Sequence, residues 1–156
     1  MAFSILFFIG LVCITTFNAM NRQLTKLENS ALLLSVFILN VNWSWIINFE
    51  LQYITYSQSP LNFAAYVIHR TIIIPLLVAI GLNSIPQAAS KGRKLITVLI
   101  SSFVLLLVIM VLQKFEVMKY ENWNTFYSYL YYVLLHGFGY LVLYCYHSWV
   151  LKGVKS

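Results

Sequence analysis

Five long apolar stretches separated by short polar breaks constrain the fold of this chain more than any other feature. The stretches cover residues 2–20, 31–53, 63–85, 95–112 and 126–151. A hydrocarbon core about 30 Å thick is crossed by roughly 20 apolar residues in an α-helix, so each stretch has about the length of a membrane span. Helices satisfy their own backbone amides in lipid, and these stretches lack the alternation of barrel strands. The sequence predicts an all-α, polytopic integral membrane bundle of five transmembrane helices, in a single domain.

The composition excludes the soluble classes of protein. Charged residues make up 9% of the 156 residues and hydrophobic residues 61%, whereas a soluble domain carries about 25% charge. The net charge of +6 could suggest a nucleic-acid partner, but the ten Lys and Arg are scattered around the apolar stretches and form no patch. We therefore expect the lipid bilayer as the environment, another membrane protein or a second copy of the chain as partner, and no nucleic acid.

Positive charges are distributed unevenly among the polar breaks. Seven of the ten fall after the first stretch, after the third stretch and in the tail, at Arg22, Lys26, Lys91, Arg93, Lys94, Lys152 and Lys155. The breaks on the opposite side hold only Lys114 and Lys119. Because cytoplasmic loops are rich in Lys and Arg, this pattern predicts an external N-terminus and a cytoplasmic C-terminus. Ile-, Leu- and Asn-rich usage adds the expectation of a bacterial cytoplasmic membrane.

Two charged residues inside the stretches point to function, because ionisable groups in a membrane are costly. At 1.5 Å per residue, Glu50 lies about 5 Å and Arg70 about 12 Å below the outer boundary. The Arg70 side chain can extend outward along the helix, so the sequence predicts a carboxylate–guanidinium pair between the second and third helices. The pair, with His69 beside it, could form a ligand site or fix the register of the two helices.

A polar face is predicted on the second helix. Asn40, Ser44 and Asn48 are spaced i, i+4 and i+8, so they lie along one side of the helix. Such a face either lines a wet pathway or hydrogen-bonds to neighbouring helices. In the third helix Pro75 frees a backbone carbonyl near Thr71 and predicts a kink, while Pro86 ends that helix.

The fifth stretch carries polar aromatic residues at the middle of the membrane. His136 and Tyr140 share one helix face, and the nearby Gly137 and Gly139 allow close approach of another helix or a flat cofactor. His136 also lies at a depth similar to that of His69. Two such imidazoles suit the axial ligation of a b-type haem, and the alternative is two histidines hydrogen-bonded to polar neighbours. Otherwise we expect no cofactor and no metal.

Catalytic signatures are missing from the sequence. It contains no Walker loop, HExxH or GxSxG motif and no Asp at all, and Cys13 and Cys145 lie in separate stretches. We therefore expect a non-enzymatic accessory, sensory or immunity-type subunit that binds a membrane partner or small ligand through an outer-half polar cluster. The alternatives are a small oligomeric transporter or channel, and a haem protein. The candidate site residues are Glu50, Arg70, His69, His136, Asn40, Ser44, Asn48 and Tyr140.

Overall fold

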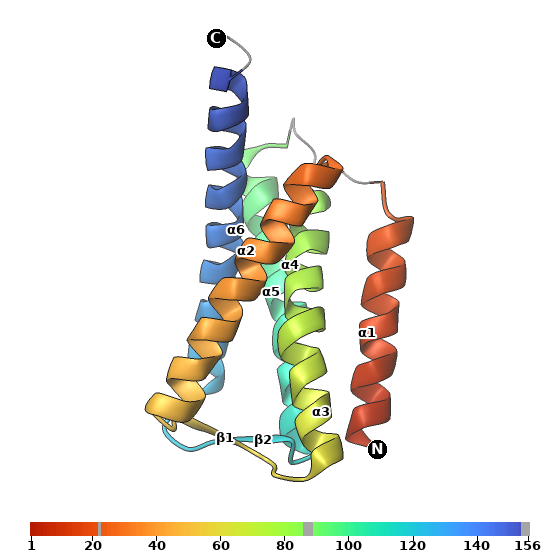
Figure 1. The fold of residues 1–156 in the computed structure, drawn as a ribbon, viewed down its shortest axis with the longest axis vertical. Coiled ribbons are helices and arrows are strands. Elements are labelled where there is room, and N and C mark those ends of the chain that lie inside the picture. The colour runs from red at the N-terminus through yellow and green to blue at the C-terminus, as the bar shows by residue number, and fades with distance from the viewer. Residues whose placement is uncertain (22, 86–88, 154–156) are drawn as a thin grey trace.

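The computed structural model describes residues 1–21, 23–85 and 89–153, with side chains described up to residue 148. It confirms the helical class, with five helices long and apolar enough to cross a membrane. These helices cover Ala2–Ala19, Lys26–Glu50, Pro60–Asn83, Lys91–Lys114 and Thr125–Ser148. They run side by side, and the start of the first helix and the end of the last helix lie at opposite ends of the bundle (Figure 1). Arg22, Pro86 and Lys155, used above for topology and helix termination, lie outside the described residues.

Two of the five helices contain a wider π-helical turn, one at its end and the other in its middle. The helical elements are α1 (Ala2–Ala19), α2 (Lys26–Trp45), η1 (Ile46–Glu50), α3 (Pro60–Ile68), η2 (His69–Ile73), α4 (Ile74–Asn83), α5 (Lys91–Lys114) and α6 (Thr125–Gly153). The π turns η1 and η2 continue α2 and α3 without a break in the helix. In η2 the Ile74 amide donates to the carbonyl of His69, because Pro75 has no amide hydrogen to continue the regular pattern. The disturbance predicted from Pro75 is therefore a π turn.

The second helix begins before its apolar stretch because a capping box extends it into polar sequence. Thr25 Oγ1 accepts a hydrogen bond from the Glu28 amide at 3.3 Å, and Glu28 Oε2 accepts one from the Thr25 amide at 2.7 Å. Together these bonds satisfy amides that the first helical turn leaves without partners. The helix therefore starts at Lys26, ahead of the predicted start at residue 31.

Two of the polar breaks between the helices contain short strands that pair with each other. Strand β1 (Ile54–Tyr56) follows η1, strand β2 (Met118–Tyr120) follows α5, and the two are antiparallel with Thr55 opposite Lys119. The ribbon lies at the end of the bundle where the chain begins (Figure 1). Both the Tyr120 hydroxyl and Trp123 Nε1 bond to Ser128 Oγ, at 2.5 and 2.9 Å. The ribbon therefore ties the α2–α3 and α5–α6 connections to the start of α6.

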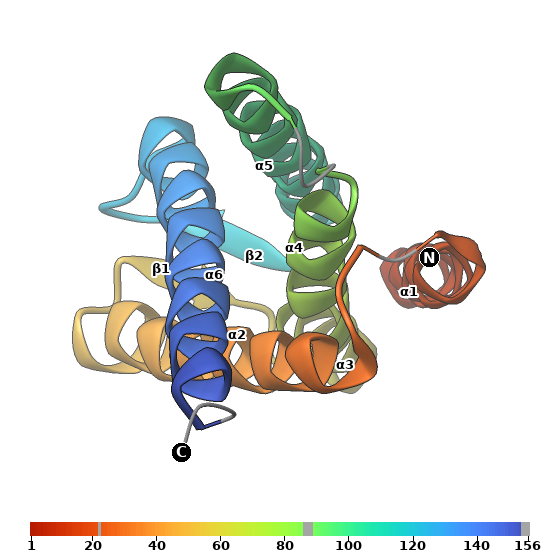
Figure 2. The same ribbon diagram turned by 90° about the horizontal axis from the view of Figure 1, so that it is seen from above.

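Viewed along the bundle, α4 lies among the other helices and α1 stands at the edge (Figure 2). Close approach depends on two glycines. A Cβ at Gly81 would lie 2.5 Å from Ser101 Oγ on α5, and one at Gly139 would lie 2.9 Å from both Leu32 and Leu82. Gly137, expected to act like Gly139, faces open space.

Large apolar side chains cover the outside of the bundle. Phe8, Leu34, Phe103 and Leu134 are between 52% and 66% exposed. Apolar exposure on this scale is typical of a surface that contacts lipid or another protein. Cys13 and Cys145 are both free.

Candidate functional site

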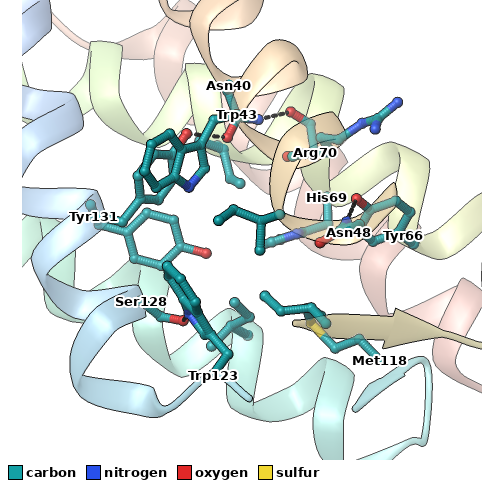
Figure 3. A pocket seen from close by; sticks show the side chains of 16 residues that line it. Asn40, Trp43, Asn48, Tyr66, His69, Arg70, Met118, Trp123, Ser128 and Tyr131 are labelled. Carbon is teal, nitrogen blue, oxygen red and sulfur yellow. Dashed lines mark hydrogen bonds between the residues drawn. The ribbon is translucent and has the colours of Figure 1, made fainter. Parts of the chain in front are cut away.

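A small cavity, lined by polar side chains set among aromatic and aliphatic ones, lies in the half of the bundle that carries the ribbon (Figure 3). We call it the polar cavity. It has a volume of about 60 Å³. Its walls come from the predicted polar face of α2 and η1, from α3 and η2, from both ribbon strands and from the start of α6. A water needs about 10–15 Å³ on this measure, whereas pockets for drug-sized ligands hold about 300–1,000 Å³. The cavity therefore has room for a few waters or one small polar group.

Both π turns contribute to the cavity wall. Ile47 and Asn48 come from η1, and His69 and Arg70 come from η2. Isolated π turns are rare and occur frequently at functional sites. Two of them facing the same small space therefore mark this part of the bundle as the leading candidate for a binding site.

Asn40 connects three helical segments at the cavity. Its side chain is 1% exposed. Nδ2 donates to the backbone carbonyl of Arg70 at 2.7 Å, and Oδ1 accepts from the Tyr131 hydroxyl at 2.8 Å. Asn48 donates to the Tyr66 hydroxyl, and Ser44 also lines the cavity. The three residues predicted to share one face of the helix therefore do line one site, and two of them bond to neighbouring helices.

His69 brings an unpaired polar atom to this space. It is 3% exposed, and its Nε2 has no hydrogen-bond partner among the described residues. Figure 3 shows the His69 ring on the cavity side of η2. Leaving a buried polar group unpaired costs about 1–3 kcal/mol. A water or ligand group that accepts from or donates to Nε2 would recover that energy.

Arg70 carries the positive charge nearest to the cavity. Its guanidinium carbon lies 5.4 Å from the centre of the Tyr66 ring, within the range of a cation–π contact. Figure 3 shows the guanidinium directed away from the middle of the cavity. The buried Nε has no hydrogen-bond partner among the described residues. Arg70 therefore contacts an aromatic face, and no described carboxylate pairs with it.

The predicted ion pair between Glu50 and Arg70 is wrong. Glu50 is exposed at the end of η1, where its Oε1 accepts from Trp45 Nε1 at 3.2 Å. The ion pairs among the described residues join Lys119 to Glu121 and His147 to Glu28. Glu50 follows Asn48 by two positions, which is about half a helical turn, so it lies on the other side of the helix and does not line the cavity.

His136 faces α5 rather than the cavity. Its Nε2 is 2.9 Å from Ser101 Oγ, and its Nδ1 is 2.8 Å from the carbonyl of Tyr132. Both ring nitrogens of His136 are therefore occupied, which fits the alternative of a histidine hydrogen-bonded to polar neighbours. His136 also does not line the cavity that His69 lines. The geometry therefore does not fit axial haem ligation by this pair. Among the described residues, no group of three potential ligands is placed to hold a metal ion.

Tyr140 lies elsewhere in the bundle, in a second pocket with Lys94 and His147. Conversely, the cavity includes aromatic residues that the site prediction left out: Trp43, Tyr66, Trp123, Tyr131 and Tyr132. Tyr131 faces inward, since it lines the cavity and its hydroxyl donates to Asn40 Oδ1. Spacing along one helix could not show this, because the partner residue lies on another helix.

No protein family, characterised protein or solved structure is significantly similar to this chain. The fold and the site define a bundle with five candidate membrane-spanning helices and a small polar cavity near one end.

Proposed function

We propose that the protein is a non-enzymatic, membrane-embedded subunit that binds a membrane partner or small ligand through the polar cavity. Its role would be of the accessory, sensory or immunity type. The observation that carries this proposal is the unpaired Nε2 of the buried His69, on a cavity bordered by two π turns. A polar group kept buried and unpaired inside a membrane helix is costly, which favours a functional role.

We propose that the cavity lies towards the outer face of the membrane and that the C-terminus lies in the cytoplasm. The end of the bundle opposite the ribbon carries Lys26, Lys91, Arg93 and Lys94 with Glu28 as its one glutamate. The other three glutamates are in or beside the ribbon-end connections. This asymmetry supports the orientation because cytoplasmic ends are enriched in Lys and Arg.

The cavity volume restricts what can be recognised. At about 60 Å³ it is several-fold smaller than a pocket for a drug-sized ligand. We therefore infer recognition of one small polar group, such as a carbonyl or carboxylate on a partner helix. Trp43 is 37% exposed and stacks on Tyr131 with ring centres 5.2 Å apart, so it forms the wall between the cavity and the membrane.

The alternative of a transporter or channel has less support from the packing. Around Gly139, side chains of α2 and α4 meet α6, with Leu32, Val78 and Leu82 closest to it. All three are at most 5% exposed. This apolar layer lies between the cavity and the pocket at the opposite end, so conduction would need an oligomeric interface or a different packing of the helices.

Photocrosslinking tests the binding role. Benzoylphenylalanine is placed at Trp43 in full-length protein in its native membranes, and at Leu34 on the same helix as the control, since Leu34 is 61% exposed. We expect a discrete adduct at position 43 only, seen as a gel shift for a protein or as an intact-mass shift for a small ligand. His69→Leu should abolish it and Glu50→Gln should not.

Two results would contradict the binding role. One is the same adduct pattern at both crosslinking positions, because lipid-facing contacts alone would produce it. The other is ion or solute flux by the purified protein in vesicles, which would favour the transporter instead.

A further inference from the structure

A larger pocket lies at the end of the bundle away from the ribbon, where α4 ends and α5 begins against α6. Its volume is about 420 Å³. The lining includes Lys94 from the first turns of α5, Leu82 from α4, and Leu143 and His147 from α6. None of the residues involved takes part in the cavity proposed above to bind a partner.

The pocket carries positive charge that no carboxylate in its wall balances. Among the described residues its ionisable side chains are Lys94, His147, Tyr140 and Tyr144. The one glutamate at this end, Glu28, is 6% exposed and already engaged. Its Oε2 accepts from the Thr25 amide, and its Oε1 is 3.1 Å from His147 Nδ1. Within the part of the chain that the structure describes, no carboxylate therefore competes for Lys94, and Lys94 can bind an anion.

The polar and apolar parts of the pocket are arranged along the helix axis. Seven residues separate Tyr140 from His147, which is about 10 Å along α6. Leu82 and Leu143 are 5% and 8% exposed and form an apolar floor. Tyr140 and Tyr144 are 53% and 70% exposed. Phenols of this kind are common where acyl chains meet headgroups.

We propose that this pocket binds an anionic glycerophospholipid of the cytoplasmic leaflet. Lys94 holds the phosphate, and the glycerol and the first acyl carbons lie along Tyr140, Tyr144 and Leu143. Basic pockets between transmembrane helices on the cytoplasmic side are suited to anionic headgroups. Phosphatidylglycerol adds a net negative charge beside Lys94, whereas the choline of phosphatidylcholine adds a second cation and weakens the attraction.

Native mass spectrometry of the full-length protein tests this site. Detergent-purified, delipidated protein is offered equimolar phosphatidylglycerol and phosphatidylcholine. We expect selective retention of phosphatidylglycerol, reduced about fivefold by Lys94→Gln, the factor for losing one basic group at an anionic surface. Lys91→Gln is the matched control, since Lys91 lies one turn earlier on α5 and outside the pocket. Lys94→Arg keeps the positive charge and should keep the selectivity. A loss with Lys94→Gln but not with Lys94→Arg is then due to the missing charge.

Each of four results would overturn the proposal. Equal loss with Lys91→Gln would mean diffuse surface attraction. Equal retention of phosphatidylcholine would mean an apolar groove. Displacement of phosphatidylglycerol by millimolar inorganic phosphate would mean a free-anion site. A dimer that excludes lipid would mean that a second copy fills the pocket.

Discussion

Gly81→Ala is expected to destabilise the bundle because it adds a methyl group where α4 meets α5 and α6. The new Cβ would lie 2.5 Å from Ser101 Oγ, 2.9 Å from Ser101 Cβ and 3.0 Å from His136 Nε2. The hydroxyl can rotate away from the methyl group. The Ser101 Cβ cannot, because it is attached to the backbone of α5, so the two helices must move apart.

The magnitude follows from the contacts that such a movement breaks. Ser101 Oγ lies 2.9 Å from His136 Nε2 and donates to the carbonyl of Leu77 at 3.2 Å. Overpacking a core costs about 1–3 kcal/mol, and a hydrogen bond between membrane helices averages about 0.6 kcal/mol. The loss of both hydrogen bonds and the cost of overpacking together lower the free energy of unfolding by about 2–4 kcal/mol.

The assay is unfolding by SDS in mixed micelles, followed by circular dichroism. Gly137→Ala is the matched control, because a Cβ at Gly137 has nothing within 4 Å, and it should be neutral or stabilising by up to about 1 kcal/mol. Gly81→Ala combined with Ser101→Ala should lose less than the sum of the two single variants, since both single variants lose the same two hydrogen bonds of Ser101. A Gly81→Ala protein as stable as the wild type would refute the reasoning.

Three further predictions concern other parts of the bundle. Asn83→Ala removes an amide that donates to Asn29 Oδ1 at 2.7 Å. It should lower the free energy of unfolding by about 1–3 kcal/mol in the same assay, because the buried Asn29 Oδ1 loses this donor. No change would mean that water replaces the amide. His69→Leu should raise the free energy of unfolding by about 1–2 kcal/mol, since a buried polar atom without a partner is removed. The same variant should abolish crosslinking to the partner. A large decrease in the free energy of unfolding would mean that His69 stabilises the fold. Burial raises the pKa of Tyr120 above its usual value of 10.0, and this effect outweighs the hydrogen bond with Ser128, which lowers the pKa. The free energy of unfolding should therefore fall as the pH rises above about 10. Tyr120→Phe should flatten that fall in an alkaline titration.

The helices were largely predictable because hydropathy depends on each segment alone. The apolar stretches and the helices agree to within a few residues at most ends, and the polar face of Asn40, Ser44 and Asn48 follows from helical spacing. The early start of α2 was missed because the capping box of Thr25 and Glu28 is polar and adds nothing to an apolar stretch. The ribbon was missed because its strands are three residues long and pair across 64 positions of sequence, from Thr55 to Lys119.

Contacts between helices depend on which faces meet, and spacing along a single helix carries no such information. Depth in the membrane grouped Glu50 and His136 with His69 and Arg70. The packing separates them, because Glu50 lies on the exposed side of its helix and His136 bonds to Ser101 on α5. Tyr140 lines the pocket at the opposite end of the bundle. Periodicity within one helix was enough to place residues on a common face, whereas their partners were decided by the packing of α4, α5 and α6 around residues such as Gly81.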